Sequence, residues 1–175
     1  SRERYFLLVV DDYTRYTTVF PLRSKGQVAD VLIPWIRTVH LQLRGWFGQD
    51  LPVLRLHSNR GVMGVARTSM IHAAAPHFLW PFAVQYTAHQ LNLWPHVSLP
   101  ETSPTLRWTR EVGDASVFRV WGSRAFVRDT SADKLSPRAI PCVFLGFVPD
   151  APGWQFYHPT SRRVFPSQDV TFDES

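Results

Sequence analysis

The pattern of apolar and polar positions in the first part of the chain predicts a β-hairpin followed by a long helix. An apolar run from Tyr5 to Val10 ends in the polar stretch 11–15, and a similar run covers Tyr16 to Leu22. Runs of this length, rich in β-branched and aromatic residues, predict two paired strands. From Gly26 to Arg44 apolar residues recur every three or four positions, which predicts an amphipathic helix on one face of a sheet. Pro34 predicts a kink or a later start for that helix.

The stretch from Pro52 to Gly61 reads as a buried strand, Val53 to Leu56, that runs into a polar tip. In α/β folds, ligands and catalytic groups gather at the carboxyl ends of strands, so we expect a functional edge here. The tip supplies an imidazole, a hydroxyl, an amide and a guanidinium from residues 57–60. It supplies no carboxylate.

The remainder of the chain predicts two more helices, a linker and then short strands. The helices are expected at Val62 to Ala75 and at Pro81 to Leu93, with a linker near residues 100–104 that Trp108 anchors to the core. The strands are expected at Arg119 to Arg128, Ile140 to Phe147, Gly153 to His158 and Arg163 to Phe172. Strands at this spacing, with Gly and Pro between them, predict a small barrel or meander.

Along the second of these strands, the alternation of Val143, Leu145 and Phe147 predicts an inward face. We place the domain boundary near Gly113, which gives domains at residues 1–112 and 113–175.

Composition points to a packed core and weakly to nucleic acid. Apolar residues make up 45% of the 175-residue chain, and the charged fraction of 19% is below the average of about 25% for free-standing soluble proteins. A piece of a larger polyprotein would fit that deficit. The formal net charge is +5, and all the basic residues except Lys25 and Lys134 are Arg, which binds phosphate through a bidentate fork. Codon bias is the alternative explanation for the Arg content.

The remaining composition makes several site classes improbable. The single Cys142 excludes an internal disulfide and a Cys-rich zinc module, and the seven His lack metal-ligand spacing. The first apolar run is too short for a signal peptide or a membrane span. We therefore expect an intracellular, soluble chain.

The paired Asp11 and Asp12 follow the first predicted strand and admit two interpretations. Carboxylates at a strand end can act as general acid, general base or metal ligands. More often such side chains accept hydrogen bonds from the backbone N–H groups of the turn.

Several segments, in order, resemble the integrase region of copia-type retrotransposon Pol polyproteins. They are Tyr5–Tyr16, Phe20–Lys25, Leu54–Ser58, Val65–Met70, Phe78–Val84 and Asn92–Pro95. Three later segments resemble the SH3-like domain that follows the catalytic core in that family, namely Phe118–Ser123, Cys142–Phe147 and Ser167–Phe172. Each phrase alone is weak, but the ordered set covers nearly the whole chain.

The resemblance implies a truncated RNase H-like integrase core, a mixed sheet with flanking helices, followed by a small SH3-like β-barrel. Enzymes of this family cut and join DNA with three carboxylates that hold two Mg²⁺ ions. Mg²⁺ prefers anionic oxygen ligands, and the paired ions stabilise the attacking and leaving oxygens at phosphorus.

The resemblance also implies that all three carboxylates are missing or replaced. The first catalytic Asp belongs to the strand before Tyr5, which this sequence does not include. Asn59 occupies the position of the second, and a neutral amide brings no charge to balance Mg²⁺. The third, a Glu, is expected upstream of Val62, but Gly61 joins Val62 directly, as if the intervening segment were deleted. Losing such electrostatics costs orders of magnitude in rate.

The sequence therefore predicts a degenerate integrase fragment, inactive in DNA strand transfer and without a cofactor of its own. We expect any remaining DNA contact through Arg55, Arg60 and Arg67, whose alternative role is that of ordinary surface residues. Because the deletion removes core material, self-association or binding to other polyprotein parts is a further expectation. A retained integrase-like role would place the chain in the nucleus.

Two other functions remain open at this point. The C-terminal domain could be a protein-interaction or assembly module that uses an exposed aromatic patch of Trp121, Trp154, Tyr157 and Phe165, although we expect most of these residues to fill a small core. The chain could also be a live nuclease or transferase that uses Asp11 and Asp12.

Overall fold

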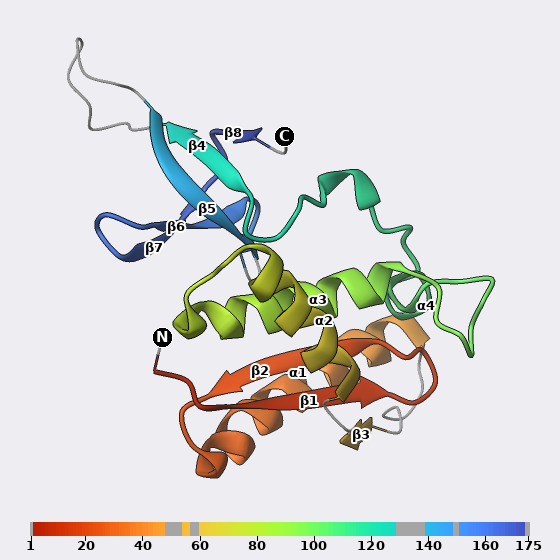
Figure 1. Ribbon diagram of the computed structural model, residues 1–175. Helices are drawn as coiled ribbons and strands as arrows, with labels where there is room; N and C mark the ends of the chain where they lie inside the picture. The colour runs from red at the N-terminus through yellow and green to blue at the C-terminus, as the bar shows by residue number, and fades with distance from the viewer. Residues whose placement is uncertain (1, 48–53, 57–59, 129–138, 149–150, 174–175) are drawn as a thin grey trace. The chain divides into compact units, whose positions relative to one another are not determined.

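A computed structural model (Figure 1) describes residues 2–47, 54–56, 60–128, 139–148 and 151–173, and of residues 42–47 and 54–56 only the backbone. By their contacts the residues form two compact units. The first comprises residues 1–62 and 87–115, and the second comprises residues 63–86 and 116–175. A boundary in chain order near Gly113 stays a prediction, because the contacts also join an internal segment to the C-terminal part.

The first unit is built on the predicted hairpin. Strands β1 (Tyr5–Asp11) and β2 (Thr17–Leu22) pair antiparallel, with Leu8 opposite Val19. On the other side of β1 lies the three-residue strand β3 (Leu54–Leu56), also antiparallel, so the sheet order is β2-β1-β3. The hairpin and the strand after the long helix are confirmed.

The arrangement of β3 corrects one expectation. We expected a mixed sheet, but every strand pairing of the described residues is antiparallel. The rule that ligands gather at the carboxyl ends of strands applies to parallel sheets, in which those ends share one edge. The position of β3 in the sheet is therefore no argument for a functional site at its end. The RNase H-like core stays a prediction.

Helix α1 (Val28–Phe47) follows the short 3-10 turn η1 (Lys25–Gln27) and lies across one face of the hairpin (Figure 1). Leu7, Val9 and Leu22 form the buried centre of this interface, and the partly buried residues packed on them are Phe20, Val28, Val31, Leu32 and Trp35. Burial of this apolar stripe is what holds the amphipathic helix on the sheet.

Of the two alternatives for Pro34, the late start of the helix is wrong, because α1 begins six residues earlier at Val28, and the kink stays a prediction. Proline removes the hydrogen bond to the carbonyl four residues before it. Here that carbonyl belongs to Asp30, an exposed residue in the first turn that water can reach. The packing of the apolar stripe thus carries the helix through the proline.

The C-terminal half of helix α3 (Trp80–Leu93) and helix α4 (Pro104–Thr109) complete the first unit. The side chain of Asn92, only 4% exposed, makes two hydrogen bonds to the backbone of Thr17 at the start of β2. Trp108 is buried on α4 and stacks on Tyr16, with ring centroids 5.0 Å apart. The predicted anchoring role of Trp108 is confirmed.

The second unit contains a five-stranded antiparallel sheet of order β7-β6-β5-β4-β8. Its strands are β4 (Arg124–Arg128), β5 (Ala139–Phe147), β6 (Trp154–His158), β7 (Arg163–Ser167) and β8 (Val170–Asp173). The single strand predicted from Arg163 to Phe172 is therefore two strands. Because the strand breaks between them, β7 pairs with β6 at one edge of the sheet and β8 pairs with β4 at the other.

The predicted inward face of β5 is only partly right. Leu145 is buried, but Val143 and Phe147 are half-buried, whereas Cys142 and Phe144 are buried. The pairing register with β6 shifts between Phe144 and Gly146. A bulge of this kind places an extra residue in one strand and breaks the two-residue period, so neighbouring residues face the core.

Helical residues pack against this sheet within the same unit. They come from α2 (Arg60–His72), the 3-10 turn η2 (His77–Leu79) and the first half of α3. Buried Tyr86 of α3 contacts the rings of Phe118, Phe144 and Phe147. Its hydroxyl donates to the Arg119 carbonyl (2.5 Å) and accepts from the Arg119 N–H (3.0 Å). The predicted helices at 62–75 and 81–93 are thus confirmed within a few residues.

Candidate functional site

The carboxylate of Asp11 is part of the turn that closes the hairpin. Asp11 is the last residue of β1 and is 2% exposed. Its Oδ2 accepts a hydrogen bond from the Thr14 N–H (2.7 Å) and another from the Thr14 hydroxyl (2.5 Å). Of the two interpretations of this residue, the hydrogen-bond acceptor of the turn is confirmed. The other oxygen, Oδ1, is buried and has no hydrogen-bond partner.

Asp12 faces a different partner. Its Oδ1 lies 3.1 Å from Nη1 of Arg15, in an ion pair whose two side chains are about 30% exposed. Such a partly exposed pair contributes little free energy, about 0–1 kcal/mol, but it neutralises the carboxylate locally. The two adjacent aspartates are thus directed to different groups of the same turn.

The carboxylates of Asp11 and Asp12 are not arranged to bind the pair of Mg²⁺ ions that the sequence resemblance implies for intact relatives. Two octahedral ions need several converging anionic oxygens. Within the part of the chain that the structure describes, no group of three or more His, Cys, Asp or Glu could hold a metal ion. One oxygen of Asp11 is taken by Thr14 and one of Asp12 by Arg15, so this turn offers a single unpaired buried oxygen.

Of the site residues that the sequence predicts around the end of β3, the structure describes only some. Asn59 and the side chain of Arg55 lie outside the described residues. Arg60 is the first residue of α2, and Arg67 lies two turns further along the same helix. Both are exposed and separated by seven positions, so they lie on the same face. The structure therefore brings these two basic groups together on one helix face.

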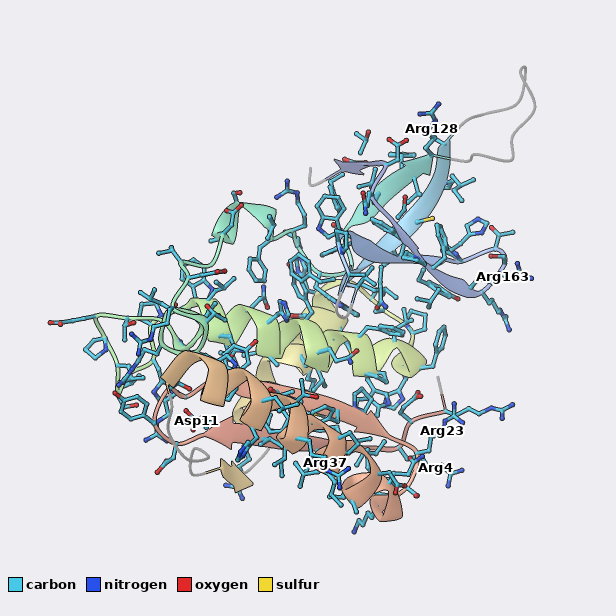
Figure 2. All side chains as sticks on the ribbon, turned by 180° about the vertical axis from the view of Figure 1, so that it is seen from behind. Arg4, Asp11, Arg23, Arg37, Arg128 and Arg163 are labelled. Atoms are coloured by element: carbon cyan, nitrogen blue, oxygen red, sulfur yellow. The ribbon has the colours of Figure 1, made fainter. Side chains whose placement is uncertain are left out.

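Sequence reasoning missed a second group of basic residues, at the opposite end of the hairpin from Asp11 (Figure 2). We call it the hairpin-end cluster, and it consists of Arg2, Arg4, Arg23 and Lys25, all exposed. The Arg4 N–H donates to the Leu22 carbonyl (2.9 Å), which brings Arg4 next to Arg23. The signal in the sequence was the pair of basic residues on each side of the predicted hairpin.

The four aromatic residues proposed as an exposed patch do not form one. Trp121 and Tyr157 are buried at 3% and 6% exposure, and Trp154 and Phe165 are half-buried. The Trp121 indole N–H donates to the Leu145 carbonyl (2.9 Å) inside the unit. The favoured interpretation as core residues is confirmed for Trp121 and Tyr157, and the alternative of an exposed aromatic patch is wrong.

The free thiol of Cys142 is equally enclosed. Cys142 lies on β5 and is 2% exposed. Burial raises the pKa of this thiol to about 11, so at neutral pH it is protonated and a poor nucleophile. We assign it to the core.

Among the described residues no helix is both long and apolar enough to cross a membrane.

Comparison with known proteins agrees with the resemblance of the sequence motifs. Residues 123–175, which contain strands β4 to β8, match the retroviral polymerase SH3-like domain. The chain is 26% identical over 211 residues to the retrovirus-related Pol polyprotein from transposon TNT 1-94 of Nicotiana tabacum. It is 24% identical over 204 residues to the one from transposon RE2 of Arabidopsis thaliana. No solved structure matches the chain.

These matches cover 98% of this chain but only 16% of the tobacco protein and 14% of the Arabidopsis protein. The chain thus spans about one sixth of the length of these curated relatives, and it is homologous to one segment of their Pol polyproteins. The first alignment extends over 211 residues against the 175 of this chain, so at least 36 positions of the tobacco protein have no counterpart here.

Proposed function

We propose that this homologue of retrotransposon Pol polyproteins, with its retroviral polymerase SH3-like domain, is a degenerate integrase segment that does not catalyse DNA strand transfer and still contacts nucleic acid. Its first unit corresponds in this proposal to a shortened RNase H-like core. The unmatched positions of the tobacco relative support the deletion that the sequence predicts after Gly61.

The observation that carries the loss of catalysis is the state of Asp11. The alternative of a live nuclease or transferase rests on Asp11 and Asp12, at the end of β1 and the start of the turn that follows. The carboxylate of Asp11 is 2% exposed and accepts two hydrogen bonds from Thr14. A catalytic or metal-binding carboxylate must instead present its oxygens to a reacting group or a hydrated ion. Asp11 therefore stabilises the turn.

The continuity of α2 supports the same proposal. Arg60 begins α2 immediately after the three residues that follow β3, and Gly61 and Val62 are consecutive residues within this helix. The site at which the resemblance implies a deletion is thus inside one regular element. A deletion that joined two segments in helical register would leave a chain that folds without the missing part.

Retained contact with nucleic acid is supported by charge. Residues 1–112 contain 12 basic and 7 acidic residues and carry all of the +5 net charge. Most of the basic groups are Arg, whose planar fork suits phosphate oxygens. The exposed Arg60 and Arg67 on one face of α2 are candidates for such contacts.

The test of catalysis is a strand-transfer and cleavage assay on labelled DNA with Mg²⁺ or Mn²⁺. We expect no metal-dependent product from the wild-type chain. A product that disappears in the Asp11→Asn, Asp12→Asn double variant would overturn the proposal and assign catalysis to the turn. A product that persists in that variant would also overturn it and place the active residues elsewhere.

The test of binding is a fluorescence anisotropy titration of labelled DNA between 50 and 200 mM salt. Phosphate contacts release counterions, so affinity must fall steeply as salt rises. Absence of binding at low salt, or binding that does not depend on salt, would remove nucleic-acid contact from the proposal.

A further inference from the structure

The strongest unassigned feature is the hairpin-end cluster of Arg2, Arg4, Arg23 and Lys25. We propose that it is the main site at which this chain binds the phosphodiester backbone of nucleic acid, ahead of the motif-derived residues Arg55, Arg60 and Arg67. This inference rests on the proposed function, because it names the surface through which the contact with nucleic acid is made.

The first argument is the local excess of positive charge. The backbone hydrogen bond from Arg4 to Leu22 sets Arg4 beside Arg23, which places two cations next to each other at the end of a strand pair. Like charges at neighbouring cross-strand positions are destabilising, so a bound anion would relieve the repulsion. Figure 2 shows Arg4 and Arg23 at this end of the hairpin and Arg37 further along α1.

The second argument is that the acidic groups nearby do not neutralise the cluster. Glu3 lies between Arg2 and Arg4 in the sequence, and its Oε1 is 4.0 Å from Nε of Arg23; the Arg23 side chain is 65% exposed and the Glu3 side chain 22% exposed. A single pair at this distance, with its cation in solvent, offsets little of the charge of four basic side chains. Asp30 in the first turn of α1 is the first acidic residue after Lys25, and it is exposed. The cluster therefore keeps most of its charge available.

The third argument is the aromatic ring within the cluster. Tyr5 is 42% exposed, and Lys25 Nζ lies 5.7 Å from the centroid of its ring. Surfaces that bind single-stranded nucleic acid combine basic groups along the backbone with exposed rings on which bases stack. The basic groups and the exposed ring of this cluster lie within residues 2–5 and residues 23–25, which follow β2.

The fourth argument is a comparison with the other basic surfaces. Arg128 pairs with Asp169 at 3.2 Å, and Arg15 pairs with Asp12 at 3.1 Å, so each of these cations has a close carboxylate. Arg60 and Arg67 are only two charges, seven positions apart on one face of α2. The hairpin-end cluster has four basic side chains against one carboxylate at 4.0 Å, a larger excess than either of these ion pairs or the α2 pair has.

The experiment measures the salt dependence of binding to labelled duplex DNA for the full chain and five variants. If each cluster residue neutralises one phosphate, wild-type affinity falls about 150-fold between 50 and 200 mM salt. The Arg4→Ala, Arg23→Ala variant should then lose only about 12-fold over the same range, and should bind at least tenfold more weakly at 50 mM. Arg4→Lys, Arg23→Lys should retain most of the affinity, because the charge remains.

The matched control is Arg128→Ala, Arg163→Ala, which removes two exposed Arg of the second unit. It should leave affinity and salt slope unchanged, and its thermal unfolding should match that of the cluster variant, because all four side chains are exposed. Tyr5→Ala, measured on duplex and on single-stranded DNA, distinguishes the two forms of the ligand. A loss confined to the single strand assigns base stacking to Tyr5, and an equal effect on both assigns backbone contact alone.

The outcomes separate this inference from the proposed function. If the wild-type chain binds with a steep salt slope and the cluster variant is indistinguishable from it, the inference is wrong and nucleic-acid binding stands. If the Arg60→Ala, Arg67→Ala variant loses binding instead, the main binding site lies on α2 and the inference is wrong. If the wild-type chain does not bind, both fail together.

Discussion

The hydrogen bonds between Asn92 and the backbone of Thr17 provide a sharp test of how the first unit is held together. Asn92 Oδ1 accepts from the Thr17 N–H at 2.7 Å, and Asn92 Nδ2 donates to the Thr17 carbonyl at 2.8 Å. The amide thus acts as one residue of an additional strand beside β2, an edge strand of the sheet. Exposed strand edges are sites of unwanted pairing, and this contact covers the start of one.

The expected cost of removing the amide follows from these two bonds. Each contributes about 0.5–1.5 kcal/mol net, so Asn92→Ala loses about 1–3 kcal/mol of unfolding free energy. Alanine has the better helix propensity and returns at most about 0.7 kcal/mol. We expect a net loss of about 1–2 kcal/mol for Asn92→Ala.

Asn92→Asp should be the more damaging change although it preserves the shape of the side chain. The carboxylate still accepts from the Thr17 N–H, but its second oxygen faces the Thr17 carbonyl in place of a donor. The position is 4% exposed, so the charge is poorly solvated. We expect a loss of about 3 kcal/mol or more at pH 7. The loss should shrink near pH 4, because a protonated acid can donate to that carbonyl.

The assay combines urea unfolding, followed by far-ultraviolet circular dichroism, with hydrogen exchange of the Thr17 amide. The control is Gln90→Ala on the same helix, a change of similar size at a half-buried position. Thr17 exchange should accelerate at least tenfold in both Asn92 variants and stay unchanged in the control. Equal stability of Asn92→Asp and the control at pH 7, with Thr17 still protected, would refute the reasoning.

Three further predictions concern the second unit. Tyr86→Phe keeps the ring contacts and removes both hydrogen bonds to the Arg119 backbone, so urea unfolding should show a loss of about 1–2 kcal/mol, and a loss below about 0.5 kcal/mol would contradict the role of the hydroxyl. Gly122→Ala places a Cβ 2.2 Å from that of Ala73 at a backbone φ of +81°, so its thermal unfolding should reveal a loss of at least about 2 kcal/mol, and a wild-type melting temperature would contradict the packing. Because burial raises the pKa of Cys142 to about 11, alkylation by iodoacetamide at pH 8 should be at least about a hundredfold slower in the folded chain than in urea. The stability contributed by the neutral thiol is complete below its unfolded pKa and is lost as pH rises through about 11, and Cys142→Ala should abolish that part of the alkaline loss.

What the sequence determined by itself are the elements whose periodicity reflects burial on one face. The hairpin of β1 and β2 follows from two runs of strand-forming residues around a polar turn. Helix α1 follows from an apolar stripe that is strong enough to carry it through Pro34. The family resemblance was available as well, because it rests on short phrases in order along the chain. The periodicity is a local property of each segment, and the family motifs are recognised by their order along the chain. Neither requires knowing which segments contact each other in the fold.

The tertiary structure alone decided the features that depend on distant partners. Asn92 lies 75 residues from Thr17 in the sequence, and neither local sequence predicts the hydrogen bonds between them. The bulge in β5, which buries Phe144 beside Leu145, depends on the register with β6. The hairpin-end cluster forms because the hairpin brings residues 2–4 next to residues 23–25. A periodic pattern records which face of an element is buried, whereas only the folded chain establishes which side chains, far apart in sequence, come to share one place.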